Sequence, residues 1–285
     1  MKQRQHKVLD HPILGYFLLA IYVSIFTSIG GLIDSLIARF LPGYGVEMTV
    51  YGRTAMTASG VGYAFGALLG ASIFFFWFRP NFKGFLKKKD IAAGLLMLLP
   101  FLLVHYTGSV VSWFEFGIGN VLIAFLRAFA PGFSEEFMFR GLGIANFMRT
   151  IKEEKQITTI WILSSVVFGL IHILNGAVGA DPVAAIIQSI YAIGVGLILG
   201  AVYLRTGNLW PTIIGHLTVD FMEFIRGDMS KSGGLMIGMG IGDWITIAAS
   251  VVAVFLAIRL MNKKYYPEIM ELWNDKWSMN EPAKD

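Results

Sequence analysis

The sequence lacks cysteine altogether, and Asp, Glu, Lys and Arg together make up only 15% of its 285 residues. The first absence excludes a disulfide framework, a thiolate metal site and a cysteine nucleophile. The second leaves the chain well below the roughly 25% of charged residues in an average soluble domain. Hydrophobic residues reach 55%, and the mean hydropathy is +0.64. A soluble fold could not cover so much apolar surface, so these values indicate a membrane protein with several spans.

Apolar runs of about 20 residues, the length that crosses a bilayer as a helix, recur along the whole chain. They predict an all-α, polytopic membrane protein with a bundle of about eight transmembrane helices, forming a single transmembrane domain over residues 1–285. The predicted spans are 13–33, 55–78, 91–107, 118–145, 157–175, 183–204, 210–226 and 244–262.

Basic residues alternate between the segments that join these spans. With eight spans and a cytoplasmic N-terminus, most Lys and Arg fall in segments predicted to be cytoplasmic, as the positive-inside rule requires. The exceptions outside the membrane are Arg39, Arg53, Arg226 and Lys231. We therefore predict that both termini are cytoplasmic. As a separate expectation, the membrane is a bacterial plasma membrane.

The two ends of the chain carry separate predictions. The first span follows a basic stretch as a signal peptide would, but it is too long for an ordinary signal and is predicted to be retained. The tail, 263–285, is polar and has Trp273 and Trp277 at helical spacing. It either lies on the membrane surface or is a solvated tail.

Ionisable residues inside predicted spans are costly and usually face the protein interior or a watery cavity. Here they form three groups: Ser134-Glu135-Glu136-Phe137-Met138-Phe139-Arg140 in the fourth span, Phe168-Gly169-Leu170-Ile171-His172 in the fifth, and His216-Leu217-Thr218-Val219-Asp220 in the seventh.

Helical spacing places particular residues of each group on the same helix face. Glu136 and Arg140 are four residues apart, so they can pair on one helix face, while Glu135 points about 100° away. His216 and Asp220 share a face in the same way, and Phe168 can pack beneath the ring of His172. A bundle could therefore gather Glu135, His172, His216 and Asp220 around one cavity.

Two kinds of hydrolytic site fit these residues. The H-E-x-x-H motif and a G-x-S-x-G serine are both absent, so neither that zinc motif nor an activated serine has support. Glu135, His172 and His216 could hold a divalent metal such as zinc. Alternatively, a carboxylate and a histidine could activate water directly and need no cofactor, while the other histidine stabilises an oxyanion.

The motifs E-E-x-x-x-R, F-x-x-x-H and H-x-x-x-D, in this order on separate spans, resemble the CAAX-protease and bacteriocin-processing family. This family, also called abortive-infection-like, includes the type II CAAX prenyl endopeptidases. The flanks Gly141 and Leu209-Trp210-Pro211 also fit, and the resemblance covers a catalytic core of roughly residues 120–225.

The resemblance implies an intramembrane endopeptidase that depends on glutamate, although the family was first described as metalloproteases. Glu135 would activate water with His172, Glu136 and Arg140 would support the site, and His216 with Asp220 would form the oxyanion side. The prenyl endopeptidases have Asn where this chain has Asp220. An ionised Asp cannot donate a hydrogen bond, so Asp220 would have to be protonated or would instead orient His216.

The sequence also allows other functions. One is a non-catalytic scaffold, such as a bacteriocin self-immunity protein or a sensor-kinase partner; another, a proton-coupled transporter, lacks any internal repeat. The expected partners are a peptide or membrane-protein substrate and the lipid bilayer, with no nucleic acid. His105 is predicted to be interfacial, and Arg127 is predicted to pair with Asp34, Glu115 or Glu223.

Overall fold

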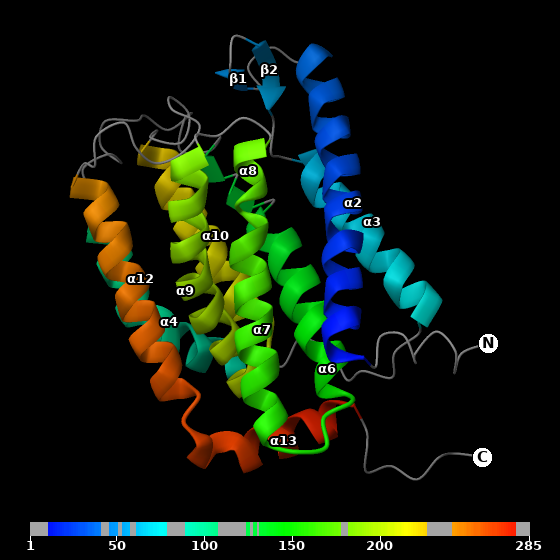
Figure 1. The fold of residues 1–285 in the computed structure, drawn as a ribbon, viewed down its shortest axis with the longest axis vertical. Helices are drawn as coiled ribbons and strands as arrows, with labels where there is room; N and C mark the ends of the chain where they lie inside the picture. Colours follow the sequence, from blue (N-terminus) through cyan, green and yellow to red (C-terminus); the bar gives the residue numbers. More distant parts are fainter. Residues whose placement is uncertain are drawn as a thin grey trace.

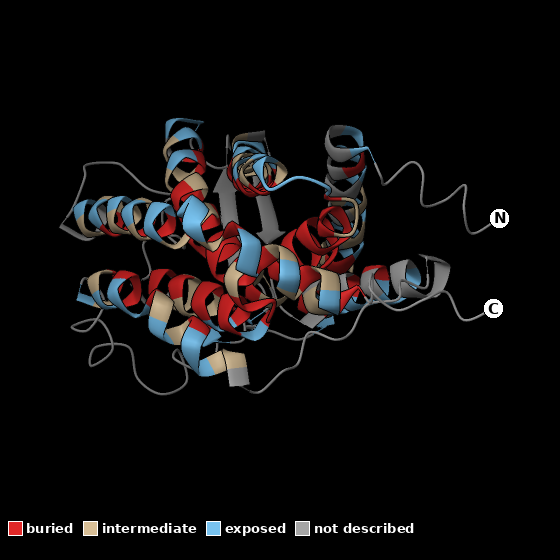
Figure 2. Ribbon diagram, turned by 90° about the horizontal axis from the view of Figure 1, so that it is seen from below, coloured by how far each residue is buried: buried red, intermediate tan, exposed pale blue. Residues whose placement is uncertain are grey.

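The computed structural model is a bundle of helices with its buried residues gathered in the centre. Figure 2, seen along the helices, shows this centre with the exposed residues on the outer faces. The structure describes residues 11–40, 46–50, 53–57, 61–78, 89–107, 124–125, 128–129, 131–177, 182–226 and 241–277.

Long apolar helices build the bundle, and the all-α fold class is confirmed (Figure 1). The long helices are α2 (Pro12–Phe40), α3 (Val61–Phe78), α4 (Lys89–Thr107), α7 (Lys155–Ile171), α9 (Pro182–Thr206), α10 (Trp210–Arg226) and α12 (Ile241–Leu260). The short elements are η1 (Phe137–Ile144), α6 (Ala145–Met148), α8 (Leu174–Ala177), η2 (Lys263–Tyr265) and α13 (Tyr266–Lys276). A small antiparallel hairpin, β1 (Val46–Val50) and β2 (Arg53–Thr57), lies at one end, outside the bundle.

Three of these helical segments are individually long and apolar enough to cross a membrane: Asp90–Thr107, Lys155–Gly176 and Ala185–Thr206. A fourth crossing is formed if Trp244–Leu260 and Lys263–Lys276, which are bent by 52°, make one broken span. Within the described part of the chain, the protein is therefore a multi-pass membrane protein, and the predicted count of eight spans is not confirmed.

Helix α9 is the centre of the bundle and packs against α4, α7, α10 and α12. Its residues Ile198, Leu199 and Val202 are fully buried. The contact with α7 is close, because a Cβ added at Gly169 would lie 2.7 Å from the carbonyl oxygen of Ser189. Small residues of this kind let membrane helices approach, and this one sits three residues before His172.

The C-terminal helix α13 crosses the end of the bundle, as Figure 1 shows. The Trp273 indole N–H donates to the Leu204 carbonyl at 3.0 Å, and that of Trp277 donates to the Ala145 carbonyl at 2.9 Å. Both indoles are buried. Over residues 263–277, the prediction of a solvated tail is therefore wrong, because the indoles reach carbonyls near helix ends. The alternative, that this segment lies on the membrane surface, stays a prediction; residues 278–285 lie outside the described residues.

Candidate active site

The segment that carries the first motif changes its helix type within the motif. Residues 131–136 are α-helical and continue into η1, a π-helix, in which the Ala145 N–H reaches back to the Arg140 carbonyl. Such π-helical turns are rare and are frequent at functional sites. Glu135 and Glu136 therefore precede the wider turn, and Arg140 lies inside it.

A glycine brings this segment against α10. A Cβ added at Gly132 would lie 2.8 Å from the backbone N and Cα of Leu217, so only glycine fits without a shift of one backbone. Leu217 directly follows His216, and Gly132 is one turn before Glu136. The close approach of these two backbones therefore brings the first and third motifs together.

Glu136 and Arg140 form the predicted ion pair in the interior of the bundle. The Arg140 Nη1–H donates to Glu136 Oε1 at 2.7 Å, and both side chains are almost fully buried. A second Arg140 nitrogen, Nη2, donates to the Gly196 carbonyl of α9 at 3.4 Å. The pair therefore ties the π-helical segment to the central helix.

His216 lies among three carboxylates. Its Nδ1 is 3.0 Å from Glu136 Oε1, and its Nε2 is 3.6 Å from Asp220 Oδ2 and 4.0 Å from Glu135 Oε2. The predicted pairing of His216 with Asp220 on one face is thus confirmed. Because the carboxylate of Glu136 accepts the Nδ1–H, the ring presents Nε2 to Glu135 and Asp220.

His172 belongs to the same cluster through Phe168. Its Nδ1 lies 2.8 Å from the Phe168 carbonyl, which only accepts, so Nε2 is its free nitrogen. The Phe168 ring centroid is 5.1 Å from that of His172 and 5.6 Å from that of His216, and the Arg140 guanidinium stacks 4.2 Å from it. The predicted packing of Phe168 beneath His172 is confirmed.

The geometry therefore joins side chains from all three motifs. Glu135 lies 4.0 Å from His216, and the expected cooperation of Glu135 with His172 stays a prediction. Within the described residues, no group of three His, Asp or Glu side chains is arranged to hold a metal ion. The alternative ligand set of Glu135, His172 and His216 thus has no preformed geometry, and metal dependence stays untested.

A second buried polar cluster escaped the sequence analysis. His105 is only 2% exposed, so its prediction as an interfacial residue is wrong. Its Nε2 lies 3.4 Å from Glu223 Oε1, which also accepts the Thr246 hydroxyl at 3.2 Å. A signal for this cluster exists in the sequence, since Glu223 is seven residues after His216 and shares its helix face.

One predicted ion pair remains, that of Arg127 with Asp34, Glu115 or Glu223. Asp34 is buried and accepts the Gly62 N–H at 2.8 Å, which ties α2 to the start of α3. Arg127 and Glu115 lie outside the described residues, so the pairing of Arg127 stays a prediction.

Comparison with known families identifies the stretch of chain that contains the three motifs. Residues 117–222 match the family model "Type II CAAX prenyl endopeptidase Rce1-like". The chain carries an Rce1-like domain. The match confirms the resemblance seen in the sequence and, at the level of the family, supports a protease. No curated protein and no solved structure matches the chain. The Rce1-like domain includes Glu135, His172, His216 and Asp220, whereas His105 and Glu223 lie outside its bounds.

Proposed function

We propose that this chain is an intramembrane endopeptidase that hydrolyses a peptide bond of a membrane-associated substrate. The observation that carries this proposal is that the carboxylates of Glu135 and Asp220 both lie within 4.0 Å of His216 Nε2 inside an apolar bundle. Buried charges are costly there and are functional by default. The Rce1-like domain supplies the reaction class.

Water activation is assigned to Glu135 and His172. Glu135 is partly accessible, unlike the fully buried Glu136, and Glu136 is already bound by Arg140 and His216. His172 offers Nε2, because its Nδ1–H is held by the Phe168 carbonyl. Glu135 takes a proton from water while the water oxygen forms a bond to the carbonyl carbon of the substrate.

His216 and Asp220 are assigned to the oxyanion side. When both ring nitrogens of His216 carry hydrogen, Nδ1–H donates to Glu136 and Nε2–H is left to donate to the developing oxyanion. The tetrahedral intermediate then collapses, the C–N bond breaks, and the proton held by Glu135 passes to the leaving amine. Arg140 acts through Glu136, since it fixes the carboxylate that orients His216.

An apolar groove beside the site supports a substrate that is delivered from the bilayer. Its volume is about 560 Å³, and Ile171 and Leu174 of its lining flank His172 in the chain. The opposite wall is a face of α2 that includes Phe17, Ile25 and Leu32. Such a groove fits an apolar chain or helix and gives a soluble peptide little to bind.

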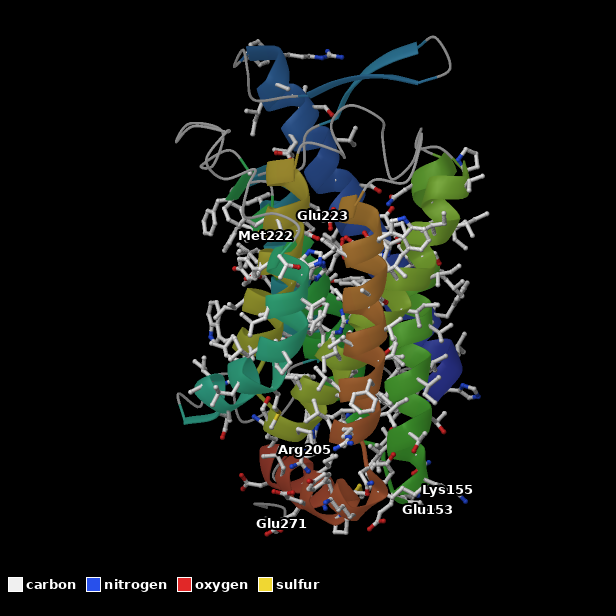
Figure 3. The ribbon with its side chains drawn as sticks, turned by 90° about the vertical axis from the view of Figure 1, so that its left-hand side faces the viewer. Glu153, Lys155, Arg205, Met222, Glu223 and Glu271 are labelled. Carbon is white, nitrogen blue, oxygen red and sulfur yellow. The ribbon has the colours of Figure 1, made fainter. Side chains whose placement is uncertain are left out.

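Glu135→Gln and His172→Ala test the mechanism in proteoliposomes. Three probes are used: a farnesylated peptide with a CAAX end, the same peptide without the lipid, and a transmembrane-helix peptide, with products read by mass spectrometry. We expect each variant to lower the rate of cleavage by about 10² to 10⁴-fold, the usual contribution of a general base. Glu153→Gln is the matched control, because Glu153 is exposed and pairs with exposed Lys155 (Figure 3).

Three outcomes would count against parts of this proposal. Cleavage by Glu135→Gln at the wild-type rate would remove Glu135 from the reaction. Absence of cleavage of every probe by the wild type would favour the non-catalytic scaffold. We propose the reaction in its form without a metal, so loss of cleavage in a chelator, with recovery on adding zinc, would favour the metal alternative.

A further inference from the structure

The buried cluster of His105, Glu223 and Thr246 joins three helices next to the candidate active site. His105 comes from α4, Glu223 from α10 and Thr246 from α12, and all three are at most 6% exposed. Figure 3 shows Glu223 in the half of the bundle away from Arg205 and Glu271, near the hairpin end. Polar groups this far inside an apolar bundle need a partner, and these hold one another.

The contacts of this cluster fall on the part of α10 that carries the site. His105 Nε2 lies 3.4 Å from the Val219 carbonyl and 3.4 Å from Glu223 Oε1. A carbonyl only accepts, so the Nε2–H is the donor, and it is shared between two acceptors on α10. Val219 directly precedes Asp220, and Glu223 is one turn beyond it.

Helix α10 is therefore held at both ends of its reactive segment. Glu136 holds His216 at one end, and the cluster holds Val219 and Glu223 at the other. Asp220 lies between His216 and Glu223 along the helix, three residues before Glu223. A rotation of α10 by one residue's angle, about 100°, would turn both His216 and Asp220 away from Glu135.

We infer that His105, Glu223 and Thr246 are positioning residues that set the rotation of α10 and so aim His216 and Asp220 at Glu135. This inference rests on the proposed function for its consequence in catalysis, but the orientation of His216 can be measured without a substrate. His105, Glu223 and Thr246 lie outside residues 117–222, the stretch that matches the Rce1-like family model.

Thr246→Val and Glu223→Leu test the inference at two strengths. Thr246→Val removes one hydroxyl at nearly constant shape, and Glu223→Leu removes the acceptor shared by His105 and Thr246. Glu223→Gln keeps an acceptor oxygen at the same place, so its His216 ring signals and its kcat should match those of the wild type. Thr158→Val is the matched control, because Thr158 makes a 2.6 Å hydrogen bond with Tyr266 that joins α7 to α13 and does not involve α10.

Two readouts separate this inference from the proposed function. With ¹⁵N-histidine labelling in nanodiscs, the His216 ring signals, identified by their loss in His216→Gln, should shift in Glu223→Leu and return in Glu223→Gln. In the peptide assay, kcat should fall by about 10-fold or more in Glu223→Leu, with KM unchanged, since misplacement by about 1 Å has effects of this size.

The inference is overturned if the His216 signals of Thr246→Val and Glu223→Leu match those of the wild type, or if Thr158→Val shifts them equally. If no probe is cleaved by the wild type, the proposed function fails while the ring signals still decide the inference. If Glu223→Leu does not fold, the His216 ring signals are compared between the milder variants Thr246→Val and Thr158→Val.

Discussion

Among the described residues, one Arg–Glu pair lies in the centre of the bundle and another at its α13 end. Arg140 and Glu136 are 2.7 Å apart and buried, whereas Arg205 meets Glu268 at 3.1 Å with the Glu268 side chain 71% exposed. The same chemistry thus occurs in opposite surroundings. A solvated pair contributes at most about 1 kcal/mol, whereas a buried pair must first overcome desolvation. The central pair is therefore better explained by the orientation of His216 than by stability.

The two regions also differ in what joins their helices. At the α13 end, uncharged indole N–H groups of Trp273 and Trp277 donate to backbone carbonyls. In the centre, the joining groups are charged: Arg140 bonds Glu136, and Glu136 holds His216. Neutral donors are sufficient to hold a helix in place. The buried charges in the centre carry a higher desolvation cost, and the chemistry proposed for Glu135 and His216 explains why they are there.

The largest expected effect comes from breaking each pair in the same way. Arg140→Met should lower the free energy of unfolding by roughly 3 to 5 kcal/mol, because it leaves a buried carboxylate without its cation. Arg205→Met should lower it by about 1 kcal/mol or less, since Glu268 returns to solvent. Denaturant titration in mild detergent measures both. Equal losses in the two variants would show that the burial difference does not govern the energetics.

A second prediction concerns the backbone approach that assembles the site. Gly132→Ala should push its helix away from Leu217 and lengthen the contact between Glu136 and His216, lowering cleavage by about 10²-fold. Gly31→Ala is the control, because a Cβ at Gly31 meets nothing within 4 Å and should leave cleavage unchanged. Peptide cleavage in proteoliposomes compares the two. A fully active Gly132→Ala would mean that the site tolerates the displacement.

The sequence could predict contacts within one helix and not those between helices. Glu136 with Arg140 and His216 with Asp220 follow from a spacing of four residues. The contact of Glu136 with His216 depends on how closely Gly132 approaches Leu217, which no periodicity records. The π-helix η1 and the docking of Trp277 onto Ala145 are likewise tertiary outcomes.

His105 shows a related limit of hydropathy reasoning. Its place late in an apolar run fixes its depth along the helix axis and predicts an interfacial residue. Burial depends on which way the side chain points, and it points to α10, where Val219 and Glu223 provide acceptors. The periodicity of α10 indicates only that Glu223 shares one helix face with His216 and Asp220; it does not indicate that His105 faces α10.

The smallest expected effect separates the charge of Asp220 from its hydrogen bonding. Asp220→Asn should keep cleavage within about tenfold of the wild type, because the 3.6 Å separation from His216 Nε2 is too long for a strong hydrogen bond. The amide can also donate directly to an oxyanion, which an ionised carboxylate cannot. Asp220→Leu, which does neither, should be much slower in the same peptide assay. If Asp220→Asn is as inactive as Glu135→Gln, the negative charge itself is required, and Asp220 then acts by holding His216 in its doubly protonated form.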